Sequence, residues 1–149
     1  MANTTWITAT GALKTTVEAL ALTWPVGTDE TLVLFGGRLP EANEPRPARH
    51  RRFRFRLGGA TTGDKITSGE RDVVRSLDMV IHYDADQDIV DAEKMMAADE
   101  ELLLVRLERE ANRPSGIASI RWTGTEIDRG DPMHPVMVLS FEMVQALAQ

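Results

Sequence analysis

Cysteine is absent from this chain. Without it the protein has no disulfide framework, no thiolate nucleophile and no cysteine-ligated zinc site. Long apolar runs are also missing, since no stretch approaches the roughly 20 apolar residues that a membrane-spanning helix needs. The first residues, Met1 to Trp6, lack the basic start and apolar core of a signal peptide. We therefore expect a soluble protein that is made in a cytoplasm and has no membrane partner.

The chain also lacks net positive charge, because its formal net charge is −6. A surface that binds nucleic acid throughout is normally basic, so the protein as a whole is not expected to coat DNA or RNA. Its 149 residues fit one domain, 1–149, which can bury about 68–70% of the surface that the unfolded chain exposes. Such a core needs no metal or disulfide to fold, and no cofactor is expected.

Basic residues gather in one short segment of this acidic chain. They are Arg46, Arg49, His50, Arg51, Arg52, Arg54 and Arg56. Phe53, Phe55 and Leu57 alternate with the last three arginines, a pattern typical of a β-strand that has one apolar and one basic face. The guanidinium groups can form ion pairs within or between subunits, contact the phosphates of a nucleic acid, or remain solvated.

The first part of the chain predicts a helix and a short strand. Residues 10–22 carry leucine and valine at helical spacing, with Thr10 as the cap. A short apolar strand follows over residues 31–35. Two polar segments, 36–50 and 58–70, then read as long loops on either side of the arginine strand. Long loops in a small domain are commonly binding loops, so we expect both to order against a partner unless they are merely mobile.

A strand and a long helix form the predicted centre of the domain. Residues 73–83 alternate apolar and polar side chains, as a half-buried strand does. Asp84, Asp86 and Asp88 then follow at the spacing of a calcium loop, but Ile89 and Met95 stand where that loop needs glycine and glutamate. We interpret Asp88 instead as the N-cap of a helix of about six turns.

One acid interrupts the apolar stripe of this predicted helix. Asp99 lies among the leucines and methionines that should face the core. It could bend outward, pair with an arginine or contact a neighbouring subunit, and the sequence leaves all three open. Residues 117–123 and 136–144 predict two more strands, paired antiparallel. The predicted fold is therefore α+β: a mixed or antiparallel β-sheet with the long helix and the N-terminal helix packed on one face.

Several segments in this order carry a resemblance to a known family. They are HYDADQDIVDAEKMMAADEELLLVRL, GIASIRW and HPVMVLSFEMVQAL, within Arg71 to Leu147. With the N-terminal helix and short strand before them, the chain resembles the tail-terminator, or tail-completion, proteins of long-tailed bacteriophages. The resemblance implies a ring, usually a hexamer, at the head-proximal end of the tail tube. Such a ring ends tube polymerisation and joins the tail to the head connector.

The resemblance also implies the partners and the location. The partners would be further copies of the chain, the tail tube protein, a head-closure or connector protein, and double-stranded DNA that passes through the ring without sequence readout. The location would be the tail or neck of the virion, after assembly in the host cytoplasm. The family has no catalytic residues to carry over. No catalytic, cofactor-binding or metal site is therefore expected.

A ring needs two different patches on each subunit, and this chain offers a basic strand and an acidic helix. We hypothesise that one or more of the arginines at 51, 52, 54 and 56 pairs across the subunit boundary with acids of residues 84–101. The candidates for the subunit interface or the DNA channel are Arg49, Arg51, Arg52, Arg54, Arg56, Asp84, Asp86, Asp99 and Glu100.

Other functions remain open at this point. A head-closure or stopper protein of the same particle, or a small non-viral adaptor, would share much of the composition. A metal-dependent enzyme could use His82, Asp84 and Asp86, which lie together at the end of a predicted strand. Against this, His50, His82 and His134 lie on separate elements and have no metal-ligand spacing.

Overall fold

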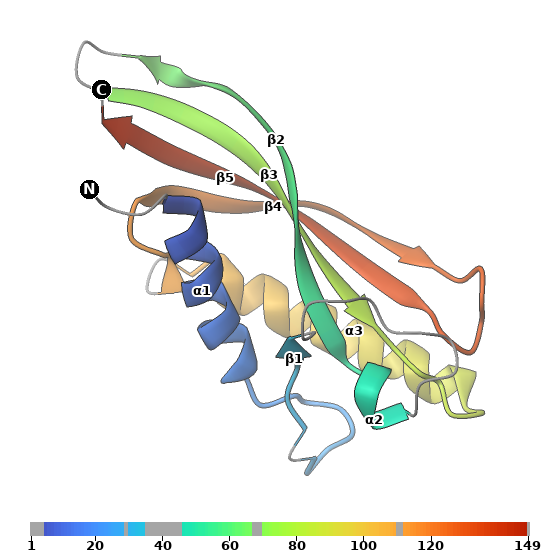
Figure 1. Ribbon diagram of the computed structural model, residues 1–149. Helices are drawn as coiled ribbons and strands as arrows, with labels where there is room; N and C mark the ends of the chain where they lie inside the picture. Colours follow the sequence, from blue (N-terminus) through green and yellow to red (C-terminus); the bar gives the residue numbers. More distant parts are fainter. Residues whose placement is uncertain (1–4, 29, 35–45, 67–69, 110–111, 149) are drawn as a thin grey trace.

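The computed structural model describes residues 5–28, 30–34, 46–66, 70–109 and 112–148 (Figure 1). A five-stranded sheet in the order β1-β2-β3-β5-β4 forms the body of the protein. Figure 1 shows the sheet strongly twisted, with helices α1 and α3 on the same side of it. The first strand pairs parallel to β2, and all other pairs are antiparallel. The predicted α+β class, with a mixed sheet and both helices on one face, is confirmed.

Four of the strands are longer than their sequence patterns suggested, whereas the strand predicted at residues 31–35 is shorter. Their bounds are β1 (Val33–Leu34), β2 (Arg52–Ile66), β3 (Glu70–His82), β4 (Ile117–Asp128) and β5 (Val136–Ala148). The antiparallel pairing predicted for the last two strands is confirmed. The central strands are longer than the part of the sheet that the helices cover. In Figure 1 one end of β2, β3 and β5 extends beyond α1.

The prediction of a loop at residues 58–70 is wrong for most of this segment. Residues 58–66 continue β2, and β3 begins at Glu70. The register shifts between Leu57 and Ala60, so a bulge takes up the two glycines without ending the strand. Gly58 is needed for a close approach of strands, because a Cβ there would lie 2.6 Å from the Cβ of Ser76. The other predicted loop, 36–50, lies mostly outside the described residues, and its last part forms helix α2 (Arg46–Arg49).

The two larger helices present an apolar stripe to the sheet. Helix α1 (Thr5–Glu18) begins earlier than predicted, and Thr10 is therefore not its cap. The Thr10 hydroxyl donates to the Trp6 carbonyl inside the helix, at 3.1 Å. Helix α3 (Ile89–Leu107) does begin at the predicted cap, since the Asp88 carboxylate accepts a hydrogen bond from the Asp91 amide at 2.9 Å.

The core lies between these helices and one face of the sheet. It combines alternate residues of the central strands with the inward stripes of α1 and α3. Leu77, Met79 and Ile81 of β3 are buried there, as the two-residue alternation predicted. Within the ranges given above, no helix combines the length and the apolar character that crossing a membrane requires.

Candidate functional site at the arginine strand and the sheet edges

The arginines of β2 lie on the sheet face opposite α1 and α3, here called the far face. Phe53 is fully buried on the helix side, so the alternation places Arg52, Arg54 and Arg56 on the other side, as predicted. Arg56 pairs with Asp78 of β3, with its Nη2 2.7 Å and its Nε 3.0 Å from Oδ2. The Nε of Arg54 is buried and has no hydrogen-bond partner among the described residues.

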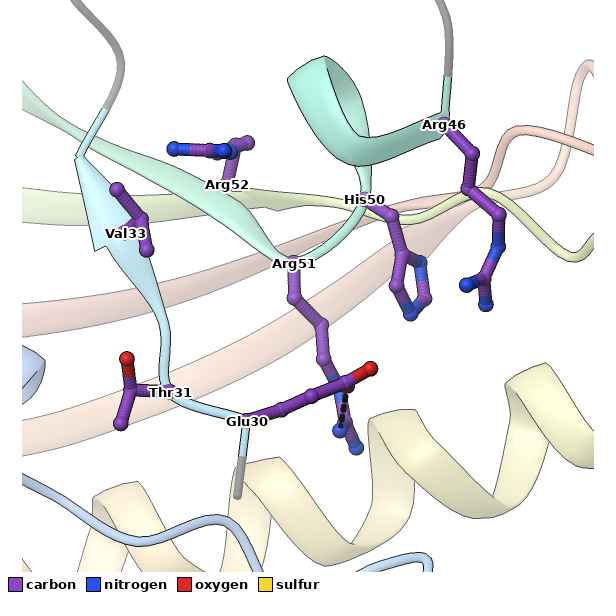
Figure 2. A pocket seen from close by; sticks show the side chains of 7 residues that line it. All are labelled: Glu30, Thr31, Val33, Arg46, His50, Arg51 and Arg52. Carbon is purple, nitrogen blue, oxygen red and sulfur yellow. Dashed lines mark hydrogen bonds and ion pairs between the residues drawn. The ribbon is translucent and has the colours of Figure 1, made fainter. Parts of the chain in front are cut away.

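Arg51 does not belong to this far-face row. It occupies an odd position, like Phe53, and its side chain is only 2% exposed, with φ 55° where the chain enters β2. The guanidinium reaches α3, where Nε lies 3.2 Å and Nη2 3.3 Å from the two carboxylate oxygens of Asp99. It also donates from Nη1 to Glu30 at 2.8 Å and from Nη2 to the Trp24 carbonyl at 2.5 Å. Figure 2 shows Arg51 running down from its strand toward α3, with the Glu30 contact dashed.

This geometry corrects two of the interface or channel candidates. Arg51 and Asp99 face each other in the interior of one subunit, so neither side chain is available to a neighbouring copy or to DNA. Of the three explanations for Asp99, pairing with an arginine holds. Asp99 is fully buried, and it also accepts a hydrogen bond from the Tyr83 hydroxyl at 2.8 Å. Two polar groups that interrupt apolar patterns thus satisfy each other.

Burial sets the electrostatics of this cluster. It raises the pKa of Asp99 to about 6, and the charge of Arg51 and the hydrogen bond from Tyr83 offset part of the rise. Burial and the Asp99 charge together raise the pKa of Tyr83 well above its ordinary value. At pH 7 the cluster therefore holds an ionised Asp99 beside a protonated Tyr83. Its role is structural, because it ties the start of β2 to α3 and to the segment before β1.

A hollow of about 350 Å³ lies beside this cluster (Figure 2). Its lining consists of Glu30, Thr31, Val33, Arg46, His50, Arg51 and Arg52. The only histidine there accepts a hydrogen bond from the Asp84 amide at its Nδ1, at 3.0 Å. Burial and the charges of Arg46 and Arg51 lower the pKa of His50 to about 4, so the ring is neutral at pH 7. His50 therefore acts as a neutral anchor for the turn after β3.

That turn holds two further candidates. The Asp84 carboxylate accepts a hydrogen bond from the Asp86 amide at 3.0 Å, and Asp86 itself is exposed with φ 48°. The Nε2 atom of His134 lies 3.7 Å from Oδ2 of Asp84, so this turn lies next to the β4–β5 connection. No three His, Cys, Asp or Glu side chains of the described chain gather to hold a metal ion. Burial and the charges of Arg54 and Arg49 lower the pKa of His82 to about 4, so that imidazole is neutral at pH 7.

The remaining candidates lie apart from one another. Arg49 is 8% exposed at the end of α2, and Glu100 is half-buried on α3. Since α3 packs on the helix face, its acids cannot reach the far-face arginines of the same subunit. Pairing between those arginines and the acids of a neighbouring copy, as hypothesised, stays a prediction.

Sequence reasoning did not identify the two free edges of the sheet. Among the residues that the structure describes, β1 covers β2 only at Arg52 and Phe53, and β4 is the last strand on the other side. A groove of about 440 Å³ runs between α1 and the uncovered part of β2. Its lining includes Trp6, Phe55 and Leu57. The alternation of apolar residues marked these strands, but nothing local in a sequence shows which strand will lie at an edge.

The sequence was also compared with known proteins. A scan against protein-family models gives no match, and a search of curated proteins gives no significant match. Function must therefore be inferred from the order of the elements, the far-face arginines and the free sheet edges.

Proposed function

We propose that this protein is a structural subunit of a bacteriophage tail. In this role several copies close into a ring at the head-proximal end of the tail tube, end its polymerisation and join the tail to the head connector. The order of elements supports the proposal: an N-terminal helix, a short strand, a long hairpin, the long helix and a second hairpin, with both large helices on one face. This is the arrangement that the sequence resemblance implies.

The two free edges of the sheet carry the proposal. An open edge presents unpaired backbone N–H and C=O groups, which proteins normally protect or use for pairing with another strand. Here one edge, on β2, is basic and flanked by an apolar groove, whereas the other, on β4, ends in exposed acids. Two different patches on one subunit make a head-to-tail contact, and a head-to-tail contact that closes makes a ring.

The far face fits the passage of DNA in such a ring. When subunits join along their sheet edges, one sheet face turns to the lumen and the other to the outside. Helices α1 and α3 occupy the helix face, so the far face, with Arg52, Arg54 and Arg56, is the one we assign to the lumen. Arg56 is already paired with Asp78, which moderates the positive charge of the row. A partly neutralised lining contacts phosphates without sequence readout and lets DNA move.

Assembly on tail tubes tests this function. The purified protein is examined by native mass spectrometry and electron microscopy, alone and after addition to polymerising tail tube protein. We expect a ring, usually of six copies, on one end of each tube, and shorter tubes than in a reaction without the protein. Labelled protein in virions should lie at the neck. A protein that stays monomeric in the presence of tubes and leaves their length unchanged would contradict the proposal.

A further inference from the structure

The pairing registers of the long strands define rows of residues that cross the whole sheet. Arg54 pairs with Val80, Val80 with Val138, and Val138 with Glu126. This row therefore begins with an arginine at the β2 edge and ends with a glutamate at the β4 edge. Both side chains lie on the far face, because residues that pair directly across neighbouring strands point to the same side of the sheet. At matching heights, the two edges of the sheet carry opposite charges.

Helix-face rows show a second kind of match. Leu57 pairs with Leu77, Leu77 with Phe141, and Phe141 with Trp122. The two residues at the ends of this row are large, apolar and exposed, Leu57 by 52% and Trp122 by 38%. The groove beside Leu57 has room for an aromatic side chain that arrives along the edge. The β2 and β4 edges thus match in apolar surface as well as in charge.

The directions of the two edge strands also fit a contact between copies. Strand β2 is antiparallel to β3, β3 to β5 and β5 to β4, so β2 and β4 run in opposite directions. Copies related by a rotation axis along the strands would then bring β2 of one copy beside β4 of the next as an antiparallel pair. In the described part of the chain β1 pairs only with Arg52 and Phe53, so the stretch of β2 that we assign to a neighbour begins at Arg54.

We propose that neighbouring copies join by antiparallel pairing of the free β2 edge of one copy with the β4 edge of the next. The pairing places Arg54 opposite Glu126 on the far face, and Leu57 opposite Trp122 on the helix face. This assignment rests on the ring of the proposed function and names the contact that closes it. Its occupant is a second copy of this chain, chosen because the two ends of each row match in charge or in apolar surface.

A disulfide test exploits the absence of native cysteine. Residues directly opposite each other in an antiparallel pair have Cα atoms about 4.5–5.5 Å apart, within the range of about 4.4–6.8 Å that disulfides span. The full-length variant Leu57→Cys/Trp122→Cys is oxidised alone and on tail tubes, and analysed on non-reducing gels. We expect a ladder of linked copies that ends in one closed species. The control variant, Leu57→Cys/Val105→Cys, moves the second thiol to a more exposed site on α3, 51% against 38%, and should give no ladder.

Charge reversal tests the second match. Arg54→Glu and Glu126→Arg should each lower the yield of rings at low salt about tenfold, and the double variant should restore it. Arg109→Glu, at an exposed site that belongs to neither edge strand, serves as the control and should leave the yield unchanged. If rings form but the 57/122 ladder is absent, the edge pairing is refuted while the proposed function stands. If neither rings nor ladders form, alone or on tubes, both fail.

Discussion

Replacing Arg51 with methionine is the most direct test of the interior. The substitution removes the cation from the buried cluster and leaves Asp99 without its counter-charge. Arg51 is 2% exposed and Asp99 is fully buried, so water cannot take the place of the guanidinium. Removing one partner of a buried ion pair costs about 3–5 kcal/mol. Asp99 can avoid part of this cost by binding a proton, and the loss of stability should therefore depend on pH.

The pH dependence follows from the pKa of Asp99. This acid has a pKa of about 6 when folded and an ordinary value of 3.8, so it binds more protons in the folded state and the wild type loses stability as pH rises from 3.8 to about 6. Above pH 6 its contribution is flat. Without Arg51 the folded pKa rises further, and the variant should keep losing about 1.4 kcal/mol per pH unit. Between pH 6 and 8 the gap to the wild type should widen by up to about 3 kcal/mol.

Urea unfolding at pH 6, 7 and 8, followed by tryptophan fluorescence, measures this gap. The control is Arg51→Met/Asp99→Leu, which removes both charges. It should show no widening above pH 6 and should be more stable than the single variant, because no uncompensated charge is left inside. If the single variant and the wild type change in parallel from pH 6 to 8, Asp99 does not depend on Arg51 and the assignment of the cluster is refuted.

Three further predictions concern the glycine bulge, the helix cap and the far-face histidine. Gly58→Ala should lower the free energy of unfolding by about 1–3 kcal/mol, because its Cβ would meet Ser76, whereas Gly59→Ala, with no atom within 4 Å of its added Cβ, should change it little; equal effects would contradict the bulge. Asp88→Ala should lower the free energy of unfolding in urea by about 0.5–2 kcal/mol, because the hydrogen bond from the Asp91 amide is lost. If the exposed control Glu101→Ala lowers it by the same amount, Asp88 is not acting as the helix cap. Since the pKa of His82 is about 4 in the folded state and 6.5 ordinarily, the unfolded chain binds more protons between these values and stability should fall as pH drops from 6.5 to 4. His82→Gln should make that fall less steep, while His50, whose pKa is also about 4, accounts for a remaining part. An unchanged slope would show that the His82 imidazole is not buried in its neutral form.

Periodicity predicted the fold class because the long elements have strong patterns. The alternation in β3 and the cap of α3 each depend on neighbours close in sequence. The extent of β2 could not be predicted in this way. Gly58 and Gly59 look like a turn, and only the approach of Ser76 from β3 shows that the first glycine makes room within a strand. Such an approach is a tertiary contact, which local propensity does not contain.

The candidate site was predicted in part. Alternation placed Arg54 and Arg56 together on one face, and the structure agrees. The same rule assigns Arg51 to the apolar side with Phe53, so the sequence already held a sign that Arg51 is buried. It also held the sign of its partner, since Asp99 breaks an apolar stripe. To predict that Arg51 pairs with Asp99, one must know how far along α3 the start of β2 lies. That position is set only when the helix packs on the sheet.

The buried cluster and the free edge are parts of one arrangement. Arg51 directly precedes β2 and binds Glu30, three residues before β1, as well as Asp99 on α3. These contacts fix where the start of β2 lies against the helix face and hold the chain that enters β1. The β1 strand then pairs only with Arg52 and Phe53, and no other described strand pairs with this edge from Arg54 onward. A loose cluster would let this edge shift against the rows that end at Glu126. Packing inside one subunit thus determines which residues meet between two.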